Sequence, residues 1–358
     1  MVASASLPFD PTPSAPRLPE GWSAPELVED VIVADGLSVC RAGIAITAPD
    51  GEEVTGSAAA LEQGRKDGDT SPAMRARYEL LERASIVEAV RSPAMAVEIR
   101  TATGGHVRTC SARDLFPESS DPSRWRYARS NGVAVHGDWS SACERALWEL
   151  AERDRILASW YGEVQPVRLD ASLAPCASTT RYEWSAWVFP EARGCRFSRG
   201  LDVVGVFGFP TSPEAPLAMG FAARPERGAA LDDATREAIQ VMAFLWGEPV
   251  PPTFPAMEPT AMGHLDFHQV RDSHRILRSW LAGDHLTYGR GDAGRGDSGP
   301  SVDGMARDAV LFADLTPPWL DGGLRVAMAL CPTARPLVFG DSPFGAHLPP
   351  ERRIHPIS

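Results

Sequence analysis

Two stretches of the sequence place carboxylates and an arginine among apolar residues. Glu79–Arg83 has the sequence Glu-Leu-Leu-Glu-Arg, and Glu149–Arg153 has the sequence Glu-Leu-Ala-Glu-Arg. On a helix, carboxylates three residues apart lie on one face, with the arginine beside them. Charges embedded in apolar helices are costly in free energy unless they are paired or bound to a metal. These stretches therefore predict two long helices that carry either a binding site or, as this common spacing also allows, a solvated charged face.

The chemistry of these side chains suits nucleotide binding. Mg²⁺ prefers one or two carboxylates together with phosphate oxygens. A guanidinium group matches phosphate oxygens as a two-pronged donor. Each stretch supplies two carboxylates and one guanidinium, so together they are a candidate site for Mg²⁺ and a nucleotide.

Helix-start signals and β-branched segments predict an α+β fold. Ser71 followed by Pro72 suits the start of the first long helix, and Ser140 or Ser141 is expected to cap the second. Helices are predicted at 73–90, 142–160, 232–245 and 265–281, and strands at 31–33, 44–46, 96–100, 130–134, 182–189, 203–209, 217–222, 310–314 and 324–329. Because the strands come in groups between long helices, we expect a mostly antiparallel sheet covered by helices.

The chain is expected to have one main domain, over 27–340, containing a mobile low-complexity loop at 283–304. Residues 1–26 are predicted to be a disordered Pro-rich lead without the basic and apolar regions of a signal peptide. Residues 341–358 form a Pro-containing tail.

Composition excludes some classes of partner and places the chain in the cytoplasm. The net charge is −12, which argues against nonspecific binding to nucleic acid or anionic membranes. No apolar run approaches the roughly 18 residues of a spanning helix. The six cysteines include no Cys-x-x-Cys pair, so neither a zinc site nor a disulfide framework is indicated, and a reducing cytoplasm fits best.

A turn before the second charged stretch resembles a known family. Ser130–Ala134 has the sequence Ser-Asn-Gly-Val-Ala, and it is followed by Gly137 and by a helix ending in Glu149–Asp154. This combination resembles the signature of the YcaO family. Weaker similarities are the turn Gly64–Asp69 before the first charged stretch, the Glu-Ala-Ile-Gln of Glu237–Gln240, and the closing region Val310–Pro332; together the likeness covers about Glu29 to Pro336.

The resemblance implies a YcaO-like fold, in which antiparallel sheets and long helices surround a central nucleotide cavity, with ATP and Mg²⁺ as cofactors. By this likeness, four carboxylates would hold Mg²⁺: Glu79, Glu82, Glu149 and Glu152. Arg153 would bind the phosphates, and the nucleotide site would be completed by Arg83, Glu237 and Gln240.

The resemblance also implies an activity. YcaO enzymes use ATP to phosphorylate the oxygen of a peptide-backbone amide, which leads to azoline-type cyclodehydration or a related modification of a ribosomal peptide. Such an enzyme would act on a precursor peptide, and a separate protein would recognise that peptide, because no region of this chain resembles a recognition domain. A homodimer stays open.

Two positions and the C-terminal tail depart from the family pattern and keep a second hypothesis open. Arg75 stands where the first motif usually has Ser, and Ser141 stands where the second helix usually has an acidic residue. The chain ends in Arg353–Ser358, which retains only a fragment of the Pro-x-Pro-x-Pro tail of azoline-forming members. The alternative is a catalytically degenerate YcaO-like scaffold or regulatory subunit.

Three histidines lie close together in the sequence of the fourth predicted helix. His264 and His268 have the spacing of a metal-binding helix, with His274 nearby, but Leu265 occupies the position where a zinc protease has Glu. A solvated helix face is therefore preferred over a zinc site.

Overall fold

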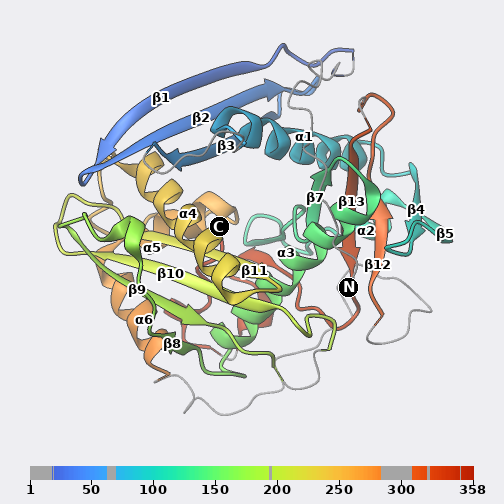
Figure 1. The fold of residues 1–358 in the computed structure, drawn as a ribbon. Helices are drawn as coiled ribbons and strands as arrows, with labels where there is room; N and C mark the ends of the chain where they lie inside the picture. Colours follow the sequence, from blue (N-terminus) through green and yellow to red (C-terminus); the bar gives the residue numbers. More distant parts are fainter. Residues whose placement is uncertain are drawn as a thin grey trace, which may run out of the picture.

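The computed structural model describes residues 18, 20–62, 70–192, 196–283, 309–320, 323–346 and 348–358. Its strands form antiparallel sheets that surround and flank long helices (Figure 1), which confirms the predicted α+β fold. The expected lead, the expected loop and the turn Gly64–Asp69 lie wholly or largely outside the described residues. Among the described helices, none is both long and apolar enough to cross a lipid bilayer.

The first sheet has the strand order β1-β2-β3, so β3 is an edge strand. Its strands are β1 (Glu26–Ala34), β2 (Leu37–Thr47) and β3 (Glu53–Leu61). The short apolar segments seen in the sequence lie inside β1 and β2, but β3 was not predicted. Its sequence is rich in Ala and has only one β-branched aliphatic residue, Val54, so it lacks the usual strand signal.

The second sheet is covered on both faces. Its order is β11-β10-β9-β8, with β8 at Val167–Leu169, β9 at Tyr182–Val188, β10 at Asp202–Pro210 and β11 at Ala218–Arg224. Val204 and Val206 pack against alanines of helix α4 (Arg227–Leu245). Val203 and Phe207 belong to a second core that includes Trp160 and Trp280. The sheet therefore lies between α4 on one side and two other helices on the opposite side.

The third sheet supports the long helix α3 (Trp139–Trp160). Its order is β5-β4-β12-β13-β7, with β4 at Ala96–Arg100, β5 at His106–Ser111, β7 at Val133–His136, β12 at Leu311–Asp314 and β13 at Arg325–Leu330. A short helix, α2 (Ala112–Leu115), follows β5, and a further two-stranded sheet pairs β6 (Trp125–Tyr127) with β14 (Val338–Gly340).

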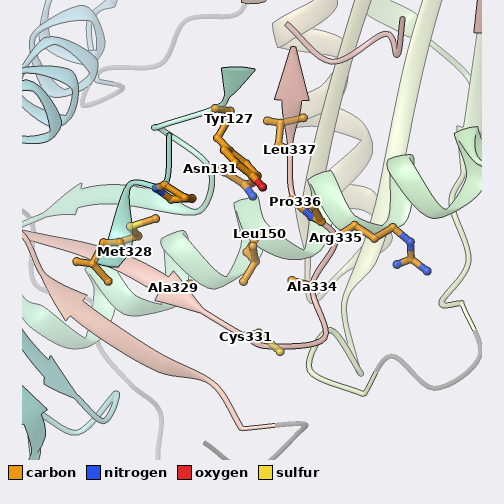
Figure 2. A pocket seen from close by; sticks show the side chains of 13 residues that line it. Tyr127, Asn131, Leu150, Met328, Ala329, Cys331, Ala334, Arg335, Pro336 and Leu337 are labelled. Carbon is orange, nitrogen blue, oxygen red and sulfur yellow. The ribbon is translucent and has the colours of Figure 1, made fainter. Parts of the chain in front are cut away.

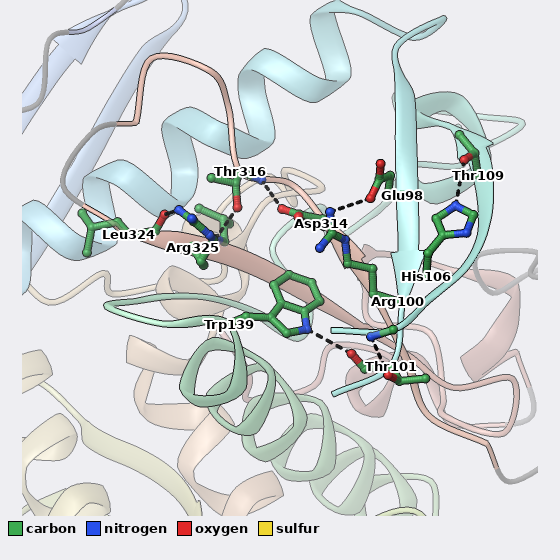
Figure 3. A network of polar contacts seen from close by, with 12 residues as sticks. Glu98, Arg100, Thr101, His106, Thr109, Trp139, Asp314, Thr316, Leu324 and Arg325 are labelled. Carbon is green, nitrogen blue, oxygen red and sulfur yellow. Dashed lines mark hydrogen bonds and ion pairs between the residues drawn. The ribbon is translucent and has the colours of Figure 1, made fainter. Parts of the chain in front are cut away.

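Polar contacts fix the start of α3 against the third sheet (Figure 3). The indole Nε1 of Trp139 donates to the carbonyl of Thr101 at 3.0 Å, and the Arg100 guanidinium lies over the Trp139 ring. Arg100 also pairs with Glu98 at 2.5 Å and with Asp314 at 3.5 Å. The cap of α3 is Asp138, whose carboxylate accepts from the Ser141 amide at 2.9 Å. The expected cap at Ser140 or Ser141 is wrong, because Asp138 starts the helix one turn earlier.

The predicted polar helix at 265–281 is two helices, α5 (Ala261–Gln269) and α6 (Arg271–Ala282). They are separated at Val270, whose backbone is extended, without the Gly or Pro that would mark a break in the sequence. The preference for a solvated face is also wrong, because His264 and His268 are fully buried. In the described part of the chain, no group of three His, Cys, Asp or Glu side chains is arranged to hold a metal, so the histidines do not form a zinc site.

The histidines instead bind the C-terminal segment. His264 Nδ1 donates to the carbonyl of His355 at 3.0 Å, and its Nε2 accepts from the Gly340 amide at 2.8 Å. His268 Nε2 donates to the carbonyl of Ile354 at 3.1 Å. Residues 354–357 are buried, and the C-terminus lies in the middle of the molecule, between α4 and α3 (Figure 1).

Candidate nucleotide site

Three helices bring the predicted charged residues together around Arg153 on α3. Its Nε lies 3.5 Å from Glu152 and 3.9 Å from Glu149. The Arg153 charge also interacts with Glu82 on α1 (Pro72–Arg91) and with Glu237 on α4. Side chains from three separate parts of the sequence thus form one cluster, and the candidate site predicted from the sequence has a common location.

Helix α1 carries its half of the cluster on a close contact with β3. A Cβ added to Gly56 would lie 2.1 Å from the carbonyl oxygen of Ala76, so only glycine allows this approach. The next amide, that of Ser57, donates to Glu79 Oε2 at 2.7 Å. Arg83 pairs with the other oxygen of Glu79 at 2.5 Å. Both oxygens of Glu79 are therefore held in a fixed orientation.

Helix α4 repeats this arrangement on β11. A Cβ on Gly220 would lie 2.3 Å from the Ala238 nitrogen, and the following amide, of Phe221, donates to Glu237 Oε2 at 2.8 Å. In both places a strand glycine lets a helix approach, and the next backbone N–H orients the helix glutamate. These orienting amides were missed in the sequence, although a glycine inside a strand is the signal for such a close approach.

Gln240 on α4 hydrogen-bonds to the edge of β3. Its Oε1 accepts from the Ala59 amide at 3.1 Å, and its Nε2 donates to the Ser57 carbonyl at 3.5 Å. Arg75 donates to the Ala59 carbonyl at 2.6 Å. The departure at Arg75 thus has a structural role, since its guanidinium satisfies an edge carbonyl of β3.

The turn before α3 orients the central carboxylate. Gly132 has φ +70°, a left-handed conformation that suits glycine, and a Cβ there would lie 3.0 Å from the Leu150 Cβ. The Gly132 amide hydrogen-bonds to Glu149, and the Ala223 amide of β11 hydrogen-bonds to Glu152. The turn and β11 therefore hold the two glutamates of α3 from opposite directions.

Electrostatics disfavour the ionisation of several carboxylates in the cluster. Burial raises the pKa of Glu149 to about 8, although Arg153 opposes the shift, and burial with the nearby Glu152 raises the pKa of Glu237 to about 7. Burial, Glu149 and Glu79 raise the pKa of Glu82 well above its usual value. Each ionised carboxylate disfavours the next, so the cluster favours an added cation over a further negative charge.

Arg153 is the central cation of this cluster. Burial alone would lower its pKa, but Glu152 and Glu149 outweigh burial and raise it. Its Nε is buried without a hydrogen-bond partner, since its ion-pair distances are long. A buried guanidinium with a free donor and adjacent carboxylates fits a ligand that has phosphate oxygens and a bound Mg²⁺, because Mg²⁺ shares its ligands between carboxylate and phosphate.

Two further features near the cluster were not predicted. Arg224, at the end of β11, acts on the charge of Glu152, forms an ion pair with Asp233 and lies over the Trp148 ring. The ring of His355 is buried within the electrostatic reach of Arg153. Neither could be found from spacing in the sequence, because both partners are distant along the chain.

Ser141 lies in the first turn of α3, whereas the charged cluster lies in the middle of that helix. Eight residues separate it from Glu149, which is about 12 Å along a helix. Its hydroxyl donates to the capping carboxylate of Asp138 at 2.7 Å. The missing acidic residue at this position therefore concerns the first turn of α3 rather than the cluster around Arg153.

This α+β chain matches a known protein family. The family model is described as YcaO cyclodehydratase, ATP- and Mg²⁺-binding, and it matches residues 109–335. The match spans more than half of the chain, and the chain belongs to the YcaO family. The family is one of ATP- and Mg²⁺-binding cyclodehydratases. No match was found among curated proteins.

Solved structures show the same fold at low sequence identity. YcaO from Methanopyrus kandleri, bound with AMPPCP and Mg²⁺, is 18% identical over 86% of this chain and 85% of that chain, with a TM-score of 0.52. The E. coli microcin synthetase McbBCD complex contains a chain that is 12% identical over 86% of this chain and 88% of that chain, with a TM-score of 0.53. A form of that complex with pro-MccB17 bound matches with a TM-score of 0.51.

Proposed function

We propose that this chain uses Mg-ATP to activate a peptide-backbone amide, leading to azoline-type cyclodehydration or a related modification of a ribosomal peptide. The observation that carries the proposal is the meeting of carboxylates from α1, α3 and α4 around Arg153. Membership in a cyclodehydratase family supports the reaction class. The relative bound with AMPPCP and Mg²⁺ supports the ligand, and the complex with pro-MccB17 bound supports a peptide substrate.

The proposed chemistry solves a leaving-group problem. A nucleophile on the peptide, such as a Cys, Ser or Thr side chain, loses its proton and attacks the amide carbon. The amide oxygen then takes the γ-phosphoryl group of ATP, and ADP leaves. Loss of phosphate together with the amide nitrogen proton forms the C=N bond of the azoline. The amide oxygen, a poor leaving group, thus departs as phosphate.

In this proposal, Glu79, Glu82, Glu149 and Glu152 hold Mg²⁺ after their side chains turn toward one another, because no three of the described carboxylates are arranged to hold a metal in the structure itself. The metal would neutralise charge during phosphoryl transfer. Arg153 donates to the phosphates. The nucleotide site is completed by Arg83, Glu237 and Gln240, of which Gln240 acts by fixing the edge of β3. Backbone amides hold one oxygen each of Glu79 and Glu237 in a fixed orientation.

The nucleotide part of the proposal is tested by calorimetry with Mg-AMPPCP. Glu149→Gln and Arg153→Met are each expected to weaken binding by at least about 100-fold, since each removes a buried charge of the site. Glu144→Gln, on the exposed face of the same helix, is the matched control and should bind normally. Equal affinity of Glu149→Gln and the unmutated chain would refute the site.

Binding should also release protons. Glu149, whose pKa is raised to about 8, must lose its proton when it binds a metal. The observed binding enthalpy at pH 7 is therefore expected to depend on the ionisation enthalpy of the buffer. A buffer-independent enthalpy would exclude Glu149 as a metal ligand.

A catalytically degenerate subunit is the second candidate function, and one observation favours it. Arg75 is committed to the Ala59 carbonyl of β3, in the place of a smaller family residue. The two functions are separated by labelling the amide oxygen of a modifiable peptide with ¹⁸O and adding ATP together with the peptide-recognition partner. An enzyme transfers the label to phosphate, whereas a scaffold leaves it in the peptide.

The proposed setting of the reaction is a complex in the cytoplasm. A separate protein would recognise the precursor peptide, as the multi-subunit character of the microcin synthetase relative suggests for that system. Whether the chain forms a homodimer is tested by measuring its molecular mass in solution.

A further inference from the structure

A pocket lies directly behind the turn that orients Glu149. It has a volume of about 40 Å³, and its walls include Tyr127, Asn131, Leu150, Met328 and Cys331 (Figure 2). Asn131 immediately precedes Gly132, whose amide hydrogen-bonds to Glu149, and Leu150 immediately follows Glu149 on α3. The turn and the helix therefore separate the pocket from the carboxylate cluster by a single layer of chain.

One polar atom in this apolar pocket has no partner. Oδ1 of Asn131 is buried and has no hydrogen bond. Buried polar groups without a partner are rare, and each calls for a water, a ligand or a functional role. A carboxamide offers both an acceptor and two donors, which match the N–H and C=O of a peptide bond. Asn131 thus gives the pocket one position that recognises an amide.

Arg335 also lines the pocket but does not give it a net charge. Arg335 pairs with Asp154 at 2.8 Å and also with Glu163, so its charge is compensated. In Figure 2 its side chain extends away from the side of the pocket that holds Tyr127 and Asn131. The pocket consequently favours an uncharged occupant.

The volume limits the size of that occupant. A water requires about 10–15 Å³ by this measure, so 40 Å³ accommodates about three waters or three to four heavy atoms. A valine or threonine side chain has this size, whereas an aromatic ring does not fit.

We infer that this pocket is a subsite for one small, uncharged side chain of a bound peptide, with Asn131 hydrogen-bonded to the neighbouring peptide amide. This inference rests on the proposed function, because it takes the ligand to be a peptide. One residue of extended chain spans roughly 3.5 Å. A side chain in the pocket therefore places the next backbone amide within reach of the Asn131 carboxamide, on the side of the turn away from the carboxylate cluster, and the subsite selects one residue of the peptide at a distance from the modified amide.

The test uses the full chain and amides of single amino acids as probes. N-acetylvaline N-methylamide should slow the alkylation of Cys331 by iodoacetamide, measured by mass spectrometry of the digested protein. Cys110, a half-buried thiol on β5 whose pKa is also raised by burial, is the internal control and should react at an unchanged rate. N-acetylphenylalanine N-methylamide should give no protection of Cys331.

Variants of the pocket sharpen the outcome. Ala334→Leu fills the pocket and should abolish protection by the valine probe, while Mg-AMPPCP binding stays normal because Ala334 lies outside the charged cluster. Leu150→Ala enlarges the pocket and should allow protection by the phenylalanine probe, once circular dichroism has confirmed folding. Asn131→Leu should remove protection by the valine probe.

Failures of the two proposals have different signatures. If neither amide protects Cys331 in the unmutated chain, or both protect it equally, the pocket holds only water or is not selective, and the subsite is overturned. If protection is observed but Mg-AMPPCP does not bind, the subsite stands and the proposed nucleotide function fails.

Discussion

The molecule contains two buried polar clusters that solve opposite electrostatic problems. Around Arg153, carboxylates from three helices crowd together, and their pKa values are raised because burial and like charges disfavour ionisation. Around His264, the histidines have lowered pKa values because burial disfavours the protonated form. The first cluster gains from an added cation, whereas the second is stable as a neutral hydrogen-bonded set.

The hydrogen bonds of the two clusters explain this difference. Each imidazole N–H of the histidine cluster donates to a main-chain carbonyl, as His264 does to His355 and His268 does to Ile354. In the carboxylate cluster, main-chain amides orient Glu79 and Glu237 but do not neutralise them. The N–H groups of the histidine cluster are thus paired within the protein, although His268 Nδ1 and His355 Nδ1 are buried without a hydrogen-bond partner. The carboxylates are oriented but not neutralised by these amides, and such a cluster is a candidate for ligand binding.

The largest expected effect comes from breaking the support of the carboxylate cluster. Gly220→Ala places a Cβ 2.3 Å from the Ala238 nitrogen, so α4 must move away from β11. We expect a loss of about 3 kcal/mol or more in the free energy of unfolding, measured by urea denaturation. Gly228→Ala on the same helix has open space at its Cβ and should leave stability unchanged or slightly raised. Equal effects of the two substitutions would contradict the close-contact argument.

Breaking the histidine cluster should have the next largest effect. His264→Ala removes the partner of two buried main-chain groups, the His355 carbonyl and the Gly340 amide. The expected cost is about 2–4 kcal/mol in the free energy of unfolding, with greater proteolysis of the C-terminal segment. His106→Ala, on exposed β5, is the control. Mg-AMPPCP binding that persists in folded His264→Ala would show that the two clusters work independently.

The two clusters should produce opposite limbs in the pH dependence of stability. The carboxylates have folded-state pKa values near 7 and 8, above the ordinary value of 4.5, so their contribution is present below pH 4.5 and lost as pH rises to about 8. His268 and His355 have folded-state values of about 3 and 4, below 6.5, so their contribution is present above pH 6.5 and lost as pH falls to about 4. The Tm of the ligand-free protein should therefore be highest between about pH 4.5 and pH 6.5, and it should fall on either side. A flat Tm from pH 4 to 9 would contradict both assignments.

The smallest expected effect concerns the loss of stability that the carboxylates cause as pH rises. Glu237→Gln replaces a carboxylate that resists ionisation with a neutral amide that retains an acceptor for the Phe221 amide. In the ligand-free protein we expect a gain of about 1 kcal/mol at pH 8, with a shallower decline of Tm between pH 4.5 and pH 7. A loss of stability at pH 8 would show that the ionised carboxylate is already compensated within the protein.

Part of this structure was accessible from the sequence. The start of α1 was predicted because Ser71 and Pro72 carry local signals, and Ser71 does accept the Met74 amide. The charged residues of α1, α3 and α4 were predicted to belong together, although the spacing alone left a solvated face open. The structure adds that Arg153 and Glu152 are largely buried, which a sequence pattern does not report.

Other parts were inaccessible for physical reasons. The split between α5 and α6 depends on an extended backbone at Val270, and no Gly or Pro at this point of the sequence predicts it. The burial of the histidines depends on carbonyls of the C-terminal segment, more than 80 residues away along the chain. The role of Gln240 depends on the edge of β3, and this strand was not predicted because its sequence is rich in alanine.

The side chains that seal the edge of β3 have a consequence for the behaviour of variants. An uncovered strand edge is a template for pairing with other chains, and proteins usually protect it. Here the amides and carbonyls of Ser57 and Ala59 are occupied by Glu79, Gln240 and Arg75. Substitutions at Glu79, Gln240 or Arg75 therefore leave backbone groups of the β3 edge without partners. A variant made at these positions to probe catalysis is also expected to aggregate more readily than the unmutated chain.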